Sequence, residues 1–309
     1  MTVLTVTLNA AIDKRYDVTA VRVGEVQRVA RVHAGAGGKG LNVARGARLC
    51  GQAVVATGFV GGFAGQFITR QIKAQGIRNE FVRVAGESRT CINIIDTAGN
   101  STEFLEPGVT VDATQLALLL TRFEGLLDEV DVVTLSGSAP SGCTDDAYVP
   151  FIQAARRAGR AVILDTSGAL LLSGLAARPT VAKPNREELA ALTGSVLPDL
   201  ASVVAAARAL CAQGPEWLVV SLGAEGAVAV DATHAVQVLA PRVTAVNPVG
   251  CGDVLVAGLA TGMASGQSVD AALPYAVQVA AAAAAHPETG CFDPDLAASL
   301  HTTTMPIPN

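Results

Sequence analysis

Short β-branched runs alternate along the chain with longer segments of helical character. Strands are predicted at 3–8, 54–57, 131–135, 162–165 and 217–221. Helices are predicted at 41–49, 64–75, 187–192, 203–212, 253–264 and 271–285. Because strands separated by helices pair in parallel and are covered on both faces, the pattern predicts an α/β fold around a mostly parallel central sheet.

Two further segments, 14–33 and 86–107, break this alternation. Each contains two short runs of alternating polar and apolar residues with no helix between them, which predicts a pair of strands. Neither pair could bury both faces in a central sheet. We therefore expect one small sheet outside it, used as a lid or a dimer surface, with ordinary edge hairpins as the alternative. Residues 1–309 then form a single domain that carries this lid.

The composition of the chain excludes several classes of protein. Half of the 309 residues are hydrophobic and 16% are charged, against about 25% in a typical protein, which excludes a disordered chain. With a net charge of −5 and 4% aromatic residues, no nucleic acid is expected as a partner. The longest apolar run, 279–285, is far shorter than the roughly 18 residues of a membrane span, so no membrane is expected. Six cysteines without a C-x-x-C pair are typical of reduced thiols and predict a cytoplasmic protein.

The first of two glycine clusters is Gly35-Ala-Gly37-Gly38-Lys39-Gly40. It matches the dinucleotide fingerprint G-x-G-x-x-G formally, but that motif needs an acidic residue about 20 positions later. No Asp or Glu occurs between 26 and 79, so a dehydrogenase is rejected. The glycines instead place a flexible backbone before a helix, with Lys39 and Asn42 near an N-terminus that favours negative charge. A glycine-rich turn without a ligand is the alternative.

The same acid-free stretch holds eight basic residues in a protein that is acidic overall. A local positive field of this kind suits an anionic small substrate. Most of these side chains are expected to be solvated on helix surfaces, and only Arg28 and Lys39 are assigned to a ligand.

The second glycine cluster, Asn247-Pro-Val-Gly250-Cys-Gly-Asp253, precedes a helix that begins near Gly252. The unpaired N–H groups of Gly250, Cys251, Gly252 and Asp253 then point at one spot, with the positive end of the helix dipole behind them. Such a spot suits a phosphoryl group in transfer. Asp253 is close enough to take a proton from an attacking hydroxyl. A plain helix cap is the alternative for Asp253, but a cap does not need the neighbouring glycines.

Together the two clusters resemble the signatures of the PfkB (ribokinase-like) family of carbohydrate kinases. The segment Gly37-Gly38-Lys39-Gly40-Leu-Asn42-Val-Ala-Arg45 resembles the N-terminal signature of the family. The segment Val249-Gly-Cys-Gly-Asp253 resembles its C-terminal signature. Further matches lie in family order at 7–13, 136–140, 165–168, 183–188 and 221–226. The resemblance implies a ribokinase-like three-layer sandwich with a small β-sheet lid.

The resemblance also implies a role for each matching residue. Sugar hydroxyls would be held by Asp13, Gly37, Gly38 and Asn42. The phosphate already on the sugar would be held by Lys39, Arg89 and Ser138, with Arg28 reaching from the lid. The ATP site would be lined by Lys183, Asn185, Ser221, Gly223 and Gly226, with the helix that starts at Val277 over the adenine. Glu188, three positions after Asn185, would orient Mg²⁺ through water, although without the family this pair indicates a helix cap and a surface carboxylate.

Cys251 departs from the family pattern, which usually has Ala or Ser at this position. A thiol at a helix N-terminus is expected to ionise more readily than a thiol in bulk water. We therefore expect an alkylating reagent to inactivate the enzyme and ATP to protect it. A side chain that packs away from solvent is the alternative.

Within the family, the chain resembles the hexose-phosphate branch, and Arg89-Thr-Cys-Ile and Asn247-Pro-Val-Gly are most similar to its tagatose 6-phosphate kinases. This implies ATP- and Mg²⁺-dependent phosphorylation of a primary hydroxyl of a ketohexose phosphate, by a homodimer joined through the lid. Fructose 1-phosphate or fructose 6-phosphate is the alternative substrate. A sugar-phosphate sensor without catalysis would not need Asp253. A kinase of nucleosides or unphosphorylated sugars would leave Lys39 and Arg89 without an anion.

Overall fold

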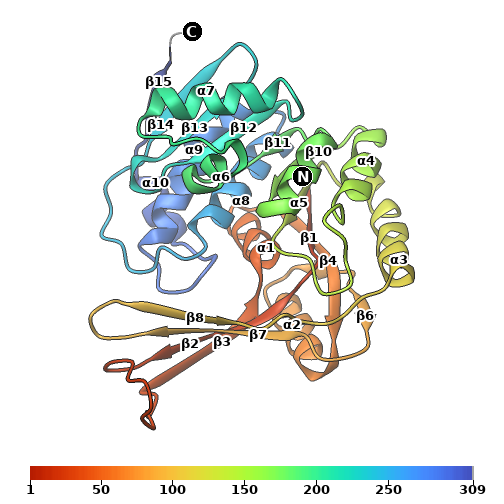
Figure 1. The fold of residues 1–309 in the computed structure, drawn as a ribbon, viewed down its shortest axis with the longest axis vertical. Coiled ribbons are helices and arrows are strands. Elements are labelled where there is room, and N and C mark those ends of the chain that lie inside the picture. Colours follow the sequence, from red (N-terminus) through yellow and green to blue (C-terminus); the bar gives the residue numbers. More distant parts are fainter. Residues whose placement is uncertain (308–309) are drawn as a thin grey trace.

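The computed structural model describes residues 1–307 and arranges their strands in two sheets (Figure 1). The larger sheet has the order β15-β14-β13-β12-β11-β10-β9-β1-β4-β5, with β6 paired to β4. Its strands are β1 (Thr2–Thr7), β4 (Ala53–Gly61), β5 (Arg78–Asn79), β6 (Val82–Val84), β9 (Val132–Ser136), β10 (Ala161–Asp165), β11 (Val181–Ala182), β12 (Trp217–Ser221), β13 (Ala227–Val230), β14 (Ala235–Leu239) and β15 (Thr303–Pro306). The pairs from β5 to β12 are parallel, whereas β12 to β15 pair antiparallel. The predicted mostly parallel sheet is confirmed.

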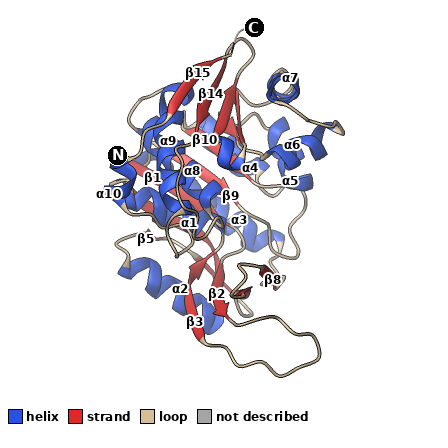
Figure 2. Cartoon of the chain, turned by 90° about the vertical axis from the view of Figure 1, so that its left-hand side faces the viewer, coloured by secondary structure: helices blue, strands red, loops and turns tan. Residues whose placement is uncertain are grey.

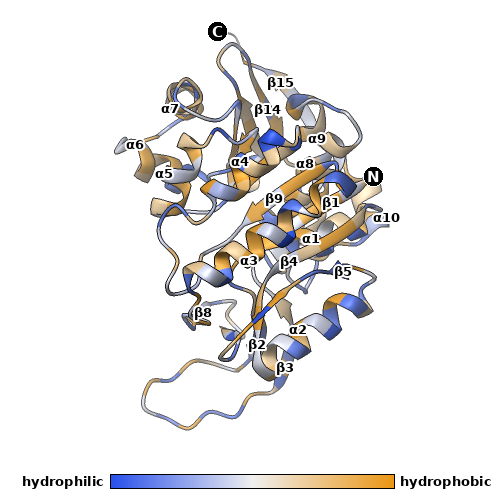
Figure 3. Ribbon diagram, turned by 90° about the vertical axis from the view of Figure 1, so that its right-hand side faces the viewer, coloured by the Kyte–Doolittle hydropathy of each residue, from blue (hydrophilic) through white to orange (hydrophobic). Residues whose placement is uncertain are grey.

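Helices cover both faces of this sheet and complete three layers (Figures 2 and 3). One face carries α1 (Lys39–Leu49), α2 (Gly62–Ala74), α8 (Cys251–Ala264) and α9 (Val269–Ala284), and α10 (Pro294–Ser299) packs against α9. The other face carries α3 (Ala113–Glu124), α4 (Val149–Arg157), α5 (Gly168–Ala176), α6 (Arg186–Thr193) and α7 (Leu200–Cys211). The short 3-10 turns are η1 (Leu127–Glu129) and η2 (Gly223–Glu225). None of the helices within residues 1–307 combines the length and the apolar character that a bilayer crossing requires.

Neighbouring residues of a central strand pack into opposite helical layers. In β10, Ile163 belongs to the core beneath α1, α8 and α9, whereas Val162 and Leu164 belong to the core beneath α3, α4 and α5. Figure 3 shows the neighbouring strands β1, β4 and β9 as strongly hydrophobic. Because each fully buried aliphatic side chain contributes about 1.5–3 kcal/mol, these strands fix the sheet between its two helical layers.

The smaller sheet has the order β3-β2-β7-β8 and is formed by the two segments that break the α/β alternation. Its strands are β2 (Ala11–Asp17), β3 (Arg31–Gly37), β7 (Arg89–Ile95) and β8 (Ser101–Leu105). β2 and β7 pair in parallel, and the two outer pairs are antiparallel hairpins. The predicted separate sheet is therefore confirmed, although its strands begin earlier, at Ala11, and β3 extends through Gly35 and Gly37 of the first cluster.

The carboxyl ends of the central strands meet at one edge of the large sheet. β1, β9 and β10 end there at Thr7, Ser136 and Asp165, and the chain passes directly from β1 into the small sheet. The small sheet extends from this edge (Figure 1). In open α/β sheets, ligands bind outside the carboxyl ends of the strands, so the fold predicts a site between the two sheets.

Candidate active site

A cleft of about 960 Å³ lies between the carboxyl edge of the large sheet and the small sheet. Its lining includes most of the predicted site residues, namely Asp13, Gly38, Lys39, Asn42, Arg89, Ser138, Lys183, Asn185, Glu188, Ser221, Gly250, Gly252 and Asp253. The fold therefore gathers into one place residues that are distributed over most of the chain.

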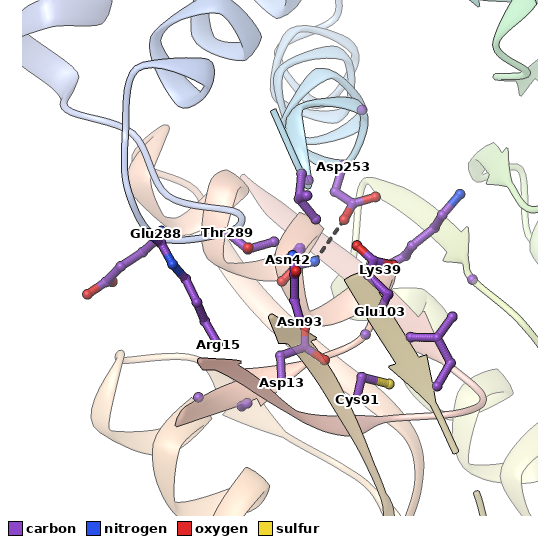
Figure 4. A pocket seen from close by; sticks show the side chains of 18 of the residues that line it. Asp13, Arg15, Lys39, Asn42, Cys91, Asn93, Glu103, Asp253, Glu288 and Thr289 are labelled. Atoms are coloured by element: carbon purple, nitrogen blue, oxygen red, sulfur yellow. Dashed lines mark hydrogen bonds between the residues drawn. The ribbon is translucent and has the colours of Figure 1, made fainter. Parts of the chain in front are cut away.

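The two glycine clusters meet in this cleft. Nδ2 of Asn42 in α1 donates a hydrogen bond of 2.8 Å to Oδ2 of Asp253 in α8, although 211 positions separate the two residues (Figure 4). Small residues permit this approach, because a Cβ at Gly46 of α1 would lie only 2.9 Å from the Cβ of Ala257 in α8. The predicted convergence of the two clusters is confirmed.

The N-terminus of α8 offers fewer free donors than the sequence predicts. Gly250 has a left-handed φ of 83°, which glycine adopts without strain. The N–H of Cys251 donates to the carbonyl of Pro248 at 3.4 Å, and the N–H of Asp253 donates to the carbonyl of Gly250 at 3.0 Å. Within residues 1–307, no such local acceptor faces the N–H groups of Gly250 and Gly252, and both glycines line the cleft. The expected anion site therefore narrows to these two donors.

The prediction of a readily ionised thiol at Cys251 is wrong. Burial, followed by the negative charge of Asp253, raises the pKa of this thiol to about 11. The residue is not part of the cleft lining, and its Sγ lies 3.9 Å from the carbonyl oxygen of Asn247. Desolvation thus outweighs the helix dipole, and the alternative of a side chain that packs away from solvent describes Cys251 better.

The carboxyl group of Asp253 is 5% exposed and sits among charges of both signs. Burial and the negative charge of Asp165 raise its pKa to about 7, while Lys39, the hydrogen bond from Asn42 and Lys183 act in the opposite direction. A carboxylate with a pKa near neutrality is well matched to accepting a proton at physiological pH.

Asp165, at the carboxyl end of β10, is a site residue to which the sequence analysis gives no role. Its side chain is fully buried, and Oδ1 forms ion pairs with Nζ of Lys39 at 3.4 Å and with Nζ of Lys183 at 3.3 Å. The negative charge of Asp165 raises the pKa of Lys39, which keeps this ammonium group charged. Its position at the start of the 165–168 match is the signal that points to it.

The small sheet contributes Asp13 to the cleft, from β2 (Figure 4). Burial raises the pKa of its carboxyl group, although the backbone N–H of Gly38 donates a hydrogen bond to it. A Cβ at Gly37 would collide with this carboxyl group, so only glycine leaves room for it. Gly37 thus leaves space for the Asp13 carboxyl group and Gly38 donates to it, whereas their predicted contacts with sugar hydroxyls stay predictions.

Arg89 and Ser138 are brought to the same wall of the cleft by Asn9. Nε of Arg89 donates to the carbonyl oxygen of Asn9 at 3.1 Å, and Nδ2 of Asn9 donates to Oγ of Ser138 at 3.4 Å. β7 of the small sheet is thereby tied to the segment that follows β9.

A family model for "pfkB family carbohydrate kinase" matches residues 6–295, which is nearly the whole chain. The chain belongs to the pfkB family of carbohydrate kinases. Phosphofructokinase-2 from Escherichia coli is 26% identical, with a TM-score of 0.88 over 96% of this chain and 97% of that one. A possible 1-phosphofructokinase from Thermotoga maritima is 27% identical, with a TM-score of 0.90 over 100% of both chains. Ribokinase from Arabidopsis thaliana, 20% identical over 96% of this chain and 97% of that one with a TM-score of 0.78, shows the ribokinase-like fold alone.

This pfkB member is an ATP-dependent sugar kinase, and part of the ATP site implied by the family lies in the cleft. Lys183 is 4% exposed there, beside Ser221, Asn185 and Glu188. Oδ1 of Asn185 accepts from the N–H of Glu188 at 2.7 Å, and Oε2 of Glu188 accepts from the N–H of Asn185 at 2.9 Å. This capping box at the start of α6 confirms the helix-cap interpretation of the pair, and both residues also line the cleft of the pfkB kinase.

Five residues implied by the family lie outside the cleft lining of this kinase, and one of them is Gly37, which packs against Asp13 instead. Arg28 is exposed in the loop between β2 and β3. Gly223 has a φ of 60° with open space around it, whereas a Cβ at Gly226 would collide with the carbonyl of Val238. Val277 is 3% exposed in the core beneath α9. Protein atoms therefore fill the space around Gly226 and Val277. Arg28 lies apart from the other site residues.

Proposed function

We propose that this pfkB kinase transfers the γ-phosphoryl group of ATP to a primary hydroxyl of a ketohexose phosphate. The supporting observation is the surroundings of Asp253. Its buried carboxyl group, the N–H groups of Gly250 and Gly252, and the ammonium groups of Lys39 and Lys183 all belong to one cleft. A base, an anion site and phosphate-binding cations are what phosphoryl transfer requires.

Each group has a definite part in the reaction. Asp253 accepts the proton of the sugar hydroxyl while the oxygen of that hydroxyl forms a bond to the γ-phosphorus of ATP. The bond from that phosphorus to the bridging oxygen breaks, and ADP leaves with the bonding electrons. The N–H groups of Gly250 and Gly252 donate to the transferring oxygens, and Lys183 adds its charge, because its Nζ would lie 3.4 Å from a Cβ at Gly252. The lid excludes water that would otherwise hydrolyse ATP.

The wall next to α6 fits a hydrated Mg²⁺ ion. Glu188 lines the cleft there, and Oδ2 of Asp165 is a buried carboxylate oxygen with no hydrogen-bond partner within the described residues. Mg²⁺ prefers oxygen donors and keeps several of its waters, so Glu188 would hold it through water. When bound, the ion supplies positive charge to the phosphate oxygens of ATP.

Tagatose 6-phosphate is the substrate that the sequence segments at Arg89 and Asn247 favour, with tagatose 1,6-bisphosphate as the product. The structural similarity to phosphofructokinase-2 and to a possible 1-phosphofructokinase favours fructose 6-phosphate or fructose 1-phosphate instead. All three sugars carry a phosphate for Lys39 and Arg89 and a primary hydroxyl for Asp253.

A coupled assay of ADP release tests the proposal with tagatose 6-phosphate, fructose 1-phosphate, fructose 6-phosphate and fructose as separate acceptors. We expect turnover with at least one phosphorylated ketohexose and a much lower kcat/KM with fructose. Among the three phosphorylated sugars, the highest kcat/KM identifies the substrate. Turnover with fructose alone would contradict the proposal, because the basic groups of the cleft would then bind no anion.

The pH dependence of this reaction follows from Asp253. Because its pKa is about 7, we expect kcat/KM for the sugar to rise with pH through neutrality and to level off above it. The measurement is the initial rate at saturating ATP across neutral pH. The control is Asp270→Asn, which removes an exposed carboxylate from the first turn of α9 and should keep the profile. A flat profile through neutral pH would contradict the assignment of Asp253 as the base.

We also propose that the lid joins two copies of this chain. In the small sheet, Val32 and Phe104 are 56% and 58% exposed, and they alternate with His33 and Glu103, which line the cleft. Alternate residues of a strand point to opposite faces, so the apolar pair lies on the face opposite to His33 and Glu103. The loop after β2 projects beyond this sheet (Figure 2) and exposes further valines. An exposed apolar surface of this kind marks an interface, and the family resemblance implies a second copy as the partner.

The Phe104→Asp substitution is expected to dissociate this dimer, because an unpaired charge buried in an interface is costly. Light scattering coupled to size-exclusion chromatography should give twice 31.3 kDa for the wild type and a single chain mass for the variant. The matched control is Val196→Asp in the loop between α6 and α7, where Val196 is 87% exposed, and it should leave the mass unchanged. A dimeric Phe104→Asp variant would exclude the lid as the interface.

A further inference from the structure

The side chain of Asn42 is held at both ends. Its Nδ2 donates to Oδ2 of Asp253 at 2.8 Å, and its Oδ1 accepts from Nη1 of Arg45 at 3.1 Å. An amide can present either its donor or its acceptor to a neighbour. Because a guanidinium group can only donate, Arg45 fixes which end of Asn42 faces Asp253.

Arg45 is itself held by two other parts of the chain. Its Nη1 donates to the carbonyl of Thr289 at 2.8 Å, in the turn 286–290 that follows α9. Its Nη2 donates to the carbonyl of Ala36 at 2.6 Å, in the lid strand β3. One guanidinium group therefore connects α1, the lid and the turn 286–290, in a fork geometry that lysine cannot reproduce.

The turn 286–290 packs closely around these groups. A Cβ at Gly290 would lie 2.8 Å from Cβ of Asn42 and 3.0 Å from Nη1 of Arg45. The carbonyl of Pro287 accepts from Nη1 of Arg15 in the lid strand β2 and from Nδ2 of Asn247 before α8, both at 3.2 Å. Figure 4 shows Thr289 beside Asn42, on the side of the cleft where Arg15 rises from the lid. The turn thus lies between the lid and the N-terminus of α8.

We propose that Arg45 is a positioning residue, which turns the donor end of Asn42 toward Asp253 and makes this contact depend on the lid strand β3. The inference rests on the proposed function, because it gives Asp253 the part of the base. Without the guanidinium group, the Asn42 amide is free to rotate and to present its oxygen to the carboxylate. Two facing oxygens repel each other, so Asp253 would hold its proton more tightly and lose its fixed orientation.

Other groups also act on Asp253 and remain in place when Arg45 is replaced. Asp165 at the end of β10 raises the pKa of Asp253, whereas Lys39 of α1 and Lys183 after β11 lower it. None of these three side chains is bonded to Arg45 within the described residues. Arg45 also lowers the pKa of Asp13 in the lid strand β2, so it is the titration of Asp253 itself that tests the path through Asn42.

The test compares Arg45→Met and Arg45→Lys with the matched control Arg48→Met, which removes an exposed arginine one turn further along α1. The pH titration of Asp253 is followed by ¹³C NMR of its carboxyl carbon, assigned as the resonance that Asp253→Asn removes. We expect both Arg45 variants to titrate at higher pH than the wild type by about one unit, which corresponds to a tenfold weaker acid. Arg48→Met should titrate like the wild type.

The Arg45→Lys variant separates the effect of orientation from that of charge, because lysine keeps the positive charge but lacks the guanidinium fork. It also serves as the second variant if Arg45→Met does not fold. A wild-type titration in Arg45→Lys would overturn the proposal, because it would show that the positive charge alone is sufficient. The proposal also fails if neither variant shifts the titration. In the active enzyme, kcat/KM at pH 6 should fall about tenfold in both variants, with KM for ATP nearly unchanged. The NMR titration does not require turnover, so it tests the role of Arg45 independently of the proposed function. A failure of the proposed function would instead be seen as wild-type protein that phosphorylates no ketohexose phosphate.

Discussion

We expect Asp253→Asn to lower kcat by about 10²- to 10⁴-fold, the usual contribution of a positioned general base. The amide keeps the shape of the side chain but cannot accept the proton of the sugar hydroxyl. Lys183 and the N–H groups of Gly250 and Gly252 remain, so the Kd for ATP should change little. The two measurements are kcat from coupled ADP release and Kd from calorimetry. Turnover close to that of the wild type would remove Asp253 from the reaction.

The stability of Asp253→Asn separates lost chemistry from lost structure. The pKa of Asp253 is about 7 in the folded protein against 3.8 for a free carboxyl group, so the folded state binds this proton more tightly. The stabilisation that protonation provides is complete below pH 4 and is lost as the pH rises through 7. Above pH 7 the wild type carries a buried charge that the variant lacks. We therefore expect Tm of Asp253→Asn at pH 8 to equal or exceed that of the wild type.

The Gly250→Ala substitution is expected to lower kcat by about 10²- to 10³-fold, as the loss of a preorganised donor does in other enzymes. A Cβ at Gly250 would lie 2.6 Å from Cγ2 of Thr289 and 3.1 Å from the backbone nitrogen of Gly290. The backbone at the start of α8 must therefore shift, and the donors of Gly250 and Gly252 shift with it. Steady-state kcat and KM for both substrates are the measurements.

The matched control for this substitution is Gly266→Ala, at the other end of α8. Gly266 has nearly the same backbone angle, with a φ of 81° against 83°, but no atom lies within 4 Å of an added Cβ. Gly266→Ala therefore measures the conformational cost of a left-handed alanine alone, about 1–2 kcal/mol of stability. It should lower Tm and leave kcat near the wild-type value. Equal values of kcat in the two variants would contradict the proposed anion site.

The central strands and the helices around them are largely predictable because their sequence pattern and their environment agree. β12 (Trp217–Ser221) is predicted at the same residues as the structure gives, since its apolar run is buried on both faces. The antiparallel strands β13 to β15 are absent from the predicted elements. Their formation depends on pairing across the sheet, as in the bridge from Val238 in β14 to Thr304 in β15, which no local pattern encodes. The helices α3, α4, α5 and α10 are absent as well, although the capping box of Asp112 and Gln115 marks the start of α3.

The site shows the same division between local and long-range information. The sequence places a glycine at 250 before a helix and an acid at 253 in its first turn, and the structure agrees. The sequence does not reveal that the side chain of Cys251 is buried. This burial makes its thiol a weaker acid, whereas the sequence predicts a thiol that ionises readily. The ion pairs of Asp165 with Lys39 and Lys183 depend on the strand order β11-β10-β9-β1, so spacing along the chain cannot predict them.

The carboxylate of Asp165, which is shared by two lysines, has a consequence for how this site stores its charge. Two ammonium groups held so near to each other would repel without an anion between them, and a dry ion triad is a poor source of folding stability. The fold itself nevertheless holds both ammonium groups at the carboxylate of Asp165, so their charges are oriented by the protein. Apolar residues of similar volume would stabilise the fold at least as well as these three charges. The triad is therefore better explained by the orientation of charge that it provides than by folding stability.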